Sequence, residues 1–271
     1  MSQRSPRGRR SKRRRERLLE RIRQFKRSDD RRGSRRPMPR AVVPSFFTLM
    51  NLFSGFLAVI QVNAGEFVFA GWLIVLAGFF DLMDGMMARL TDTVSPFGVE
   101  LDSLSDVVSF GLAPSFMVYA FGLERLNALG LIAAGLPLIC GAVRLARYNV
   151  MHEGEKKGYF DGLPIPVMAI TLVAFILTFN DPTFLDQFRW GNLSVLVPLV
   201  LLLSMLMIST IEFQALPKPT RAFLKNHPRT VIAYAVGGIL ILLFQETGLF
   251  LTMDGYIFIN LGVAVYETIW E

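Results

Sequence analysis

Long apolar runs separated by short polar stretches fill the chain after Arg40, and they restrict its fold more than any other feature. A run of about 20 apolar residues matches the roughly 30 Å of hydrocarbon in a bilayer, where the backbone must satisfy its own hydrogen bonds as a helix. Hydrophobic residues make up 52% of the 271 residues, which is too many for an ordinary soluble domain. The sequence therefore predicts an all-α polytopic membrane protein.

We predict about eight membrane spans, with six or seven as the alternative. The seventh is the weakest, because its cleanly apolar part is short for the thickness of a bilayer. The predicted spans cover residues 44–63, 67–90, 97–121, 127–147, 163–180, 192–211, 230–245 and 249–267.

The basic residues between the spans predict the orientation. With the N-terminus in the cytoplasm, nine of the 11 Lys and Arg residues after Arg40 fall on the cytoplasmic side, and only Arg125 and Arg189 fall on the other. Cytoplasmic loops of membrane proteins carry such an excess. We therefore expect an integral protein of a prokaryotic inner membrane, with its N-terminus in the cytoplasm.

Residues 1–40 form a basic tail that holds 18 Lys or Arg and four Asp or Glu, whereas residues 41–271 hold 11 and 18. This charge density excludes a packed core, so we expect a tail that is disordered or lies on an anionic membrane surface. Residues 41–271 would form the transmembrane domain. Because no folded reading domain accompanies the charges, nucleic acid is not an expected partner.

Four aspartates, Asp81, Asp84, Asp102 and Asp106, lie in otherwise apolar sequence where the second and third spans meet. Within each pair the spacing of three or four residues places both carboxylates on one helix face. The short linker makes the two spans antiparallel neighbours, so all four carboxylates converge just inside the cytoplasmic surface. Crowded carboxylates need a compensating cation, and oxygen ligands without a nearby Cys or His favour Mg²⁺ or Mn²⁺.

Small residues beside the carboxylates leave room for a ligand: Gly85 and Ala88 on the second span and Gly98 on the third. Arg89 lies at the rim of this pocket, where a guanidinium group can hold a phosphate. The combination predicts a phosphoryl-transfer site with two metal ions. The alternative from another class is a cation- or proton-coupled transporter, but transporters spread polar groups along several spans and contain repeats.

The spacing Asp81-x2-Asp84-Gly85-x2-Ala88-Arg89-x8-Gly98-x3-Asp102-x3-Asp106 resembles, position for position, the signature of the CDP-alcohol phosphotransferase family. This resemblance implies transfer of a phosphatidyl or related group from a CDP-linked donor to an alcohol, with release of CMP. It also implies that the four aspartates hold two divalent cations, that Asp106 is in addition the general base, and that the protein is a homodimer.

Further stretches resemble the membrane-embedded phosphatidylserine synthase branch of this family. They are PSFFTLMNLFSGF in the first span, LDSLSDVVSFGLAPS, AVRLARYNV and GYFDGLPIPVMA, and together they cover most of residues 44–170. The resemblance implies donor contacts from Ser45, Thr48 and Ser95, together with the glycines, Ala88 and Arg89 of the signature. The chain departs from many relatives at Ser45, where they carry Asn.

The branch resemblance implies CDP-diacylglycerol as the donor and L-serine as the acceptor, whose hydroxyl attacks the donor phosphorus while Asp106 takes its proton. Arg144 and Arg147 end the fourth span on the same side, where either can bind the serine carboxylate or a donor phosphate, or anchor the helix at the interface. Few other basic residues are available, which disfavours a phosphorylated acceptor and makes a phosphatidylglycerophosphate synthase the second choice. Anionic lipid is the expected partner of the tail.

Overall fold

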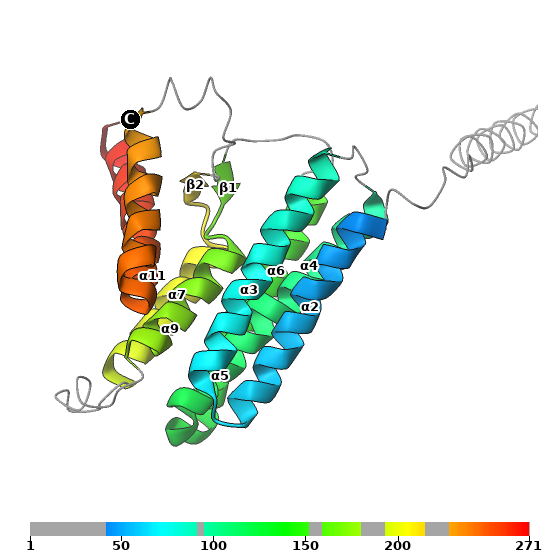
Figure 1. The fold of residues 1–271 in the computed structure, drawn as a ribbon. Coiled ribbons are helices and arrows are strands. Elements are labelled where there is room, and N and C mark those ends of the chain that lie inside the picture. The colour runs from blue at the N-terminus through cyan, green and yellow to red at the C-terminus, as the bar shows by residue number, and fades with distance from the viewer. Residues whose placement is uncertain (1–41, 91–94, 152–158, 180–192, 215–227, 271) are drawn as a thin grey trace, which may run out of the picture. The chain divides into compact units, whose positions relative to one another are not determined.

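Helices account for nearly all of the chain that the structure describes (Figure 1). In this computed structural model the described residues are 42–90, 95–151, 159–179, 193–214 and 228–270. The predicted basic tail lies outside them. From Val43 onward the chain forms one compact unit, Val43–Glu271.

The described elements are mostly helices, and two three-residue strands, β1 (Tyr159–Asp161) and β2 (Glu212–Gln214), pair antiparallel with Phe160 opposite Phe213. The helical elements are α2 (Val42–Asn63), α3 (Phe67–Leu90), α4 (Pro96–Asp106), the π-helical turn η2 (Val107–Leu112), α5 (Ala113–Phe121), the 3₁₀ turn η3 (Leu123–Leu126), α6 (Asn127–Met151), α7 (Ile165–Thr178), α9 (Leu193–Ile208) and α11 (Pro228–Trp270).

Several helices have the length and apolar composition that a membrane span requires. Two shorter apolar helices, α7 and α9, accompany them. These helices agree with the predicted all-α polytopic membrane protein, whereas the predicted count of eight spans stays a prediction. Within the described residues the stretches of spanning length are Phe46–Asn63, Phe67–Ala88, Pro96–Phe121, Leu123–Val150 and Ala235–Tyr266.

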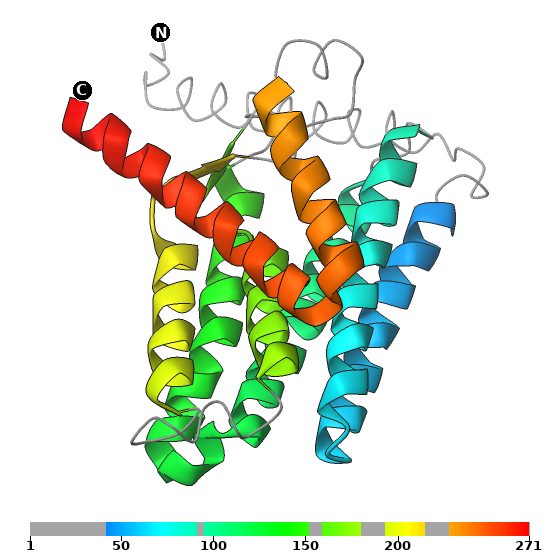
Figure 2. The ribbon, with the colours of Figure 1, turned by 60° about the vertical axis from the view of Figure 1, so that its left-hand side comes forward.

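The last two predicted spans, 230–245 and 249–267, occur as two arms of α11, which bends sharply between them (Figure 2). The bend lies at Gln245, whose φ of 44° and ψ of −105° leave the helical region. The arms pack closely where Thr252 donates a hydrogen bond to the carbonyl oxygen of Gly237 at 3.3 Å. The predicted break after residue 245 is therefore present as a sharp turn and not as a loop.

The core of the bundle surrounds α7, which packs against α3, α5, α9 and α11. Ten of its 14 residues are buried, among them Met168, Leu172 and Phe175. A helix that is apolar on all sides is usually buried by protein, and α7 fits that rule. Gly71 of α3 allows close contact with it, because a Cβ atom there would lie only 3.1 Å from the side chain of Val173.

The third predicted span is a composite of α4, η2 and α5, with a π-helical turn directly after Asp106. Pro114 has no N–H to donate to the carbonyl of Phe110, so the regular hydrogen-bond ladder cannot continue there. The N–H of Ala113 instead bonds to the carbonyl of Val108, five residues earlier. Single π-helical turns of this kind are frequent at functional sites.

Candidate active site

The ends of α3 and α4 bring the signature aspartates together. One carboxylate oxygen from each of Asp81, Asp102 and Asp106 lies within 4.8 Å of the other two. Asp84 is close enough to interact electrostatically with Asp81 and Asp102, so it borders the same cluster. Asp84 and Asp106 are buried, with 7% and 8% of their surface exposed. Three of the four carboxylates that were expected to converge therefore lie together, Asp84 borders them, and the group of three could hold a metal ion.

The helix α2 forms a further side of the cluster through two buried polar residues one turn apart, Thr48 and Asn51. The Thr48 hydroxyl donates to Oδ2 of Asp84. Nδ2 of Asn51 donates to Oδ1 of Asp106 at 3.2 Å. Thr48 was expected near the donor, whereas Asn51 was not predicted. Its signal in the sequence is an amide inside an apolar span, and such residues are usually functional.

Serine hydroxyls fix α2 against α4 and η2. Ser105 donates to the carbonyl oxygen of Thr48 at 3.2 Å, and Ser109 donates to that of Asn51 at 2.8 Å. Gly55, one turn beyond Asn51, makes this contact possible, because a Cβ atom there would lie 2.6 Å from Cα of Ser109. These contacts set the register of α2, so its two polar side chains face the aspartates.

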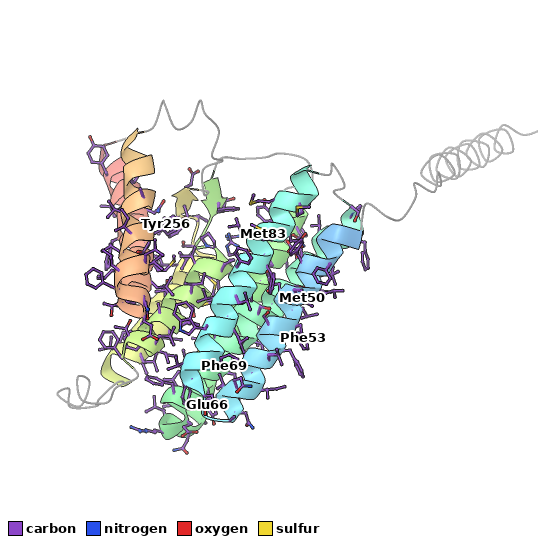
Figure 3. All side chains as sticks on the ribbon, viewed as in Figure 1. Met50, Phe53, Glu66, Phe69, Met83 and Tyr256 are labelled. Atoms are coloured by element: carbon purple, nitrogen blue, oxygen red, sulfur yellow. The ribbon has the colours of Figure 1, made fainter. Side chains whose placement is uncertain are left out.

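The other side of α2 is apolar and faces outward. Phe53 lies on this side (Figure 3), and 51% of it is exposed. The change from polar to apolar within one turn is what a membrane helix needs if one side borders a polar site and the other borders hydrocarbon.

Arg144 of α6 is a buried cation beside the cluster, with 6% of its surface exposed. It interacts electrostatically with Asp106, and its guanidinium carbon lies 5.7 Å from the ring centre of Phe160. Its Nε has no hydrogen-bond partner. Arg144 is therefore available to an anionic group near Asp106.

Arg147, one turn further along α6, has a different environment. Its guanidinium group donates to the backbone carbonyl oxygens of Asp161 at 3.0 Å, Ile208 at 3.1 Å and Ser209 at 3.3 Å. These bonds tie α6 to β1 and to the end of α9. The two arginines were predicted as equivalent candidates, and the structure separates a backbone-bound Arg147 from an Arg144 beside the cluster.

The remaining predicted donor contacts lie around the α3–α4 connection. Ser95 is the N-cap of α4, and its hydroxyl accepts a hydrogen bond from the N–H of Gly98 at 3.0 Å. Gly85 and Ala88 follow Asp84 on α3. Ser45 and Arg89 lie within α2 and α3 respectively, and their side chains are outside the described part of the chain.

Comparison with known proteins identifies the family. The model of the family described as CDP-alcohol phosphatidyltransferase matches residues 41–203, which include the whole aspartate cluster. The chain belongs to this family. Membership sets aside the transporter alternative, because the family is one of phosphatidyltransferases.

Several curated members of the family are similar to this chain. The CDP-diacylglycerol–serine O-phosphatidyltransferase of Helicobacter pylori (strain ATCC 700392 / 26695) is 37% identical over 176 residues, which cover 65% of this chain and 73% of the relative. The protein of the same name from Bacillus subtilis (strain 168) is 36% identical over 171 residues, 63% of this chain and 89% of the relative. The archaetidylserine synthase of Methanothermobacter thermautotrophicus is 36% identical over 173 residues, 63% and 69% of the two chains.

CDP-alcohol phosphatidyltransferases generally use divalent metal ions, and the residues of this chain fit that requirement. The clustered side chains of Asp81, Asp102 and Asp106 offer carboxylate oxygens alone, the ligands that hard cations prefer. Arg144 is the described cation that interacts with this cluster, and one positive charge does not balance three carboxylates. A divalent ion bound to these carboxylates would supply the positive charge that the cluster otherwise lacks.

Proposed function

We propose that this chain transfers the phosphatidyl group of CDP-diacylglycerol to L-serine, giving phosphatidylserine and CMP. The observation that carries the proposal is the convergence of Asp81, Asp102 and Asp106 within 4.8 Å of one another in a member of this family. The names of the bacterial relatives support diacylglycerol and serine as the two substrate groups. The enzyme is accordingly a CDP-diacylglycerol–serine O-phosphatidyltransferase.

The four aspartates, Asp81, Asp84, Asp102 and Asp106, would together hold two divalent cations, Mg²⁺ or Mn²⁺. When bound, these ions would neutralise the donor pyrophosphate and stabilise the departing CMP. Thr48 holds the Asp84 carboxylate in place through its hydrogen bond. Such supporting contacts orient the ligands of a metal site and tune its affinity.

Asp106 acts as the general base in this proposal. Asn51 donates to Oδ1 of the Asp106 carboxylate, which leaves Oδ2 to accept the proton of the serine hydroxyl. The serine oxygen then forms a bond to the phosphorus that carries diacylglycerol. The bond from this phosphorus to the oxygen of CMP breaks, and CMP leaves with the electron pair.

The donor would lie against the ends of α3 and α4. Gly85, Ala88 and Gly98 leave space for its pyrophosphate and nucleotide, and Arg89 would contact a phosphate. Hydroxyl contacts to the donor would come from Ser45, Thr48 and Ser95. The acyl chains would remain in the hydrocarbon region, which explains why a reaction with a water-soluble acceptor takes place at the ends of membrane helices.

The surroundings of the enzyme follow from its charges. The excess of basic residues favours a cytoplasmic active site, and we place the enzyme in a prokaryotic inner membrane. Residues 1–40 would attract anionic lipid to the catalytic domain, residues 41–271. A homodimer is the assembly that family membership favours.

CMP release by the purified protein tests the proposal. We expect CMP to form from CDP-diacylglycerol when L-serine and Mg²⁺ or Mn²⁺ are present, with phosphatidylserine as the lipid product. Glycerol 3-phosphate and inositol phosphate serve as competing acceptors in parallel reactions. Faster release with glycerol 3-phosphate than with L-serine would replace this proposal by the phosphatidylglycerophosphate synthase alternative.

A further inference from the structure

Two buried polar atoms beside Asp106 have no hydrogen-bond partner. In the described part of the chain four buried side-chain polar atoms lack a partner, and two of them are Oδ1 of Asn51 and Nε of Arg144. Asn51 bonds to Asp106 and Arg144 interacts with its charge, so both flank the proposed base. Buried polar groups without a partner are rare in proteins, and two on residues that interact with one carboxylate call for a ligand.

The orientation of the Asn51 amide follows from its neighbour. The NH₂ of Asn51 faces Asp106 and donates to its Oδ1, as a carboxylate oxygen that accepts hydrogen bonds requires. The carbonyl Oδ1 must then be turned elsewhere as a free acceptor, and the residue is 0% exposed. A ligand that donates a hydrogen bond, such as an ammonium group, would satisfy it.

Arg144 offers the opposite chemistry. Its Nε–H is a donor, its side chain is buried, and the positive charge is close to Asp106. An anionic oxygen would satisfy this donor and form a charge-assisted hydrogen bond. Arg147 cannot take this role, because its guanidinium group already bonds to three backbone carbonyl oxygens.

We infer that Asn51 and Arg144 recognise the amino-acid end of the acceptor, with the ammonium group on Oδ1 of Asn51 and the carboxylate on the guanidinium group of Arg144. An α-amino acid carries one strong donor and one strong acceptor on a single carbon atom, which matches one free acceptor on Asn51 and one free donor on Arg144, two residues that both interact with the base. The serine hydroxyl then points to Asp106. This inference rests on the proposed function and adds the two residues that select the acceptor.

Two fragments of serine separate the two contacts. Ethanolamine is serine without its carboxylate, and 3-hydroxypropionate is serine without its ammonium group. Their inhibition constants against L-serine, measured at saturating donor and metal, report each contact by itself. Asn51→Ala and Arg144→Met are the variants, and Met keeps most of the apolar stem of Arg144.

We expect each variant to raise the KM for L-serine about tenfold or more, as the loss of one hydrogen bond to a charged group would. Asn51→Ala should raise the inhibition constant of ethanolamine to the same extent and leave that of 3-hydroxypropionate unchanged. Arg144→Met should do the reverse. The KM for CDP-diacylglycerol should stay constant in both variants.

Matched controls come from amides outside the cluster. Asn260 of α11 is buried and donates to the carbonyl of Tyr256 at 2.8 Å, and Asn149 of α6 donates to Ser103 at 3.0 Å. Asn260→Ala and Asn149→Ala should keep the KM for serine and both inhibition constants. If Asn51→Ala does not purify, Asn51→Ser provides the same comparison, and thermal stabilisation by CMP shows that each variant retains its donor site.

Several outcomes would overturn the inference while leaving the proposed function intact. A raised KM for the donor in Arg144→Met would assign Arg144 to a donor phosphate, and a raised metal requirement in Asn51→Ala would make Asn51 a metal ligand. A fall in kcat alone would also contradict the inference. So would an equal rise in the inhibition constants of ethanolamine and 3-hydroxypropionate in each variant. Failure of the unaltered protein to release CMP with L-serine would instead refute the proposed function.

Discussion

Thr48 of α2 donates a hydrogen bond to the carboxylate of Asp84 on α3, although 36 positions separate the two residues in the sequence. This bond joins the first membrane helix to a residue that we propose as a metal ligand. Because Thr48 does not belong to the aspartate signature, its substitution tests whether α2 is part of the active site or only packs beside it.

Replacing Thr48 by Val removes the donor and keeps the shape of the side chain. We expect the Mg²⁺ or Mn²⁺ concentration for half-maximal CMP release to rise about 10- to 100-fold, the range seen when partners of metal ligands are removed. Thr48→Ser should restore the unaltered requirement. Thr171 of α7 gives a matched control, because its hydroxyl bonds to the Val167 carbonyl at 2.7 Å. A Thr171→Val protein that shifts the metal requirement equally would count against the role of Thr48.

The aspartates should respond as metal ligands. Asp81→Asn, Asp84→Asn and Asp102→Asn should each abolish CMP release in protein that inserts and purifies normally, because each substitution removes a charged ligand. A chelator should abolish activity of the unaltered protein, and Mg²⁺ or Mn²⁺ should restore it. Asp254→Asn in α11 provides the control for loss of an acidic residue elsewhere. Full turnover in chelator would rule out the two-metal proposal.

Gly55 tests the contact between α2 and η2. A Cβ atom at this position would lie 2.6 Å from Cα of Ser109, so Gly55→Ala must push the two helices apart. We expect a loss of about 1–3 kcal/mol in the free energy of unfolding, as overpacking usually costs, together with reduced CMP release. Gly135→Ala on α6 is the control, since nothing lies within 4 Å of its added Cβ. Equal melting temperatures for both variants in detergent would contradict the close packing.

The proposed orientation predicts how introduced cysteines react. Cys140 is the only cysteine of the chain and is buried, so a Cys140→Ala background removes its signal. Single cysteines at Asn63 and Thr93 should be labelled by a membrane-impermeant reagent from opposite sides, with Thr93 on the cytoplasmic side. Labelling of both from the same side would break the antiparallel pairing of the second and third spans.

The basic tail should enrich anionic lipid without taking part in the chemistry. Each basic residue near an anionic surface contributes roughly 1 kcal/mol, and salt weakens the attraction. Deleting residues 2–36 should therefore raise the apparent KM for CDP-diacylglycerol in bilayers, less so at high ionic strength, and leave turnover in detergent nearly unchanged. An equal loss of maximal rate in detergent and bilayers at every salt concentration would assign the tail a structural or catalytic role.

The meeting of the aspartates of α3 and α4 could be predicted because it depends on short-range features. The spacing of Asp81, Asp84, Asp102 and Asp106 fixes their helix faces, and the short linker fixes the direction of the two spans. Apolar run lengths likewise placed the helices to within a few residues. Residue spacing, linker length and apolar run length can all be read from the sequence without knowledge of tertiary contacts.

The contribution of α2 could not be predicted in the same way. Its register depends on hydroxyls of Ser105 and Ser109 that reach the carbonyls of Thr48 and Asn51, and no periodic pattern reports such bonds. The different roles of Arg144 and Arg147 depend on where β1 and the end of α9 lie, which local sequence does not specify. Bonds over 57 and 58 positions hold α2, while bonds over 61 and 14 positions tie Arg147 to the end of α9 and to β1.

The π-helical turn η2 lets a single membrane helix serve two unlike surroundings. One extra residue in a helical turn rotates everything after it by about 100° relative to a regular helix. Before the turn, Asp102 and Asp106 face the aspartate cluster; after it, Met117 and Val118 of α5 are fully buried among apolar neighbours. Removing one residue from η2 would shorten the span by a single position and hardly change its composition, yet it would turn the two halves out of phase. One extra residue in η2 thus changes which face of the span meets the aspartates and which meets the core, and a hydropathy profile cannot show this change.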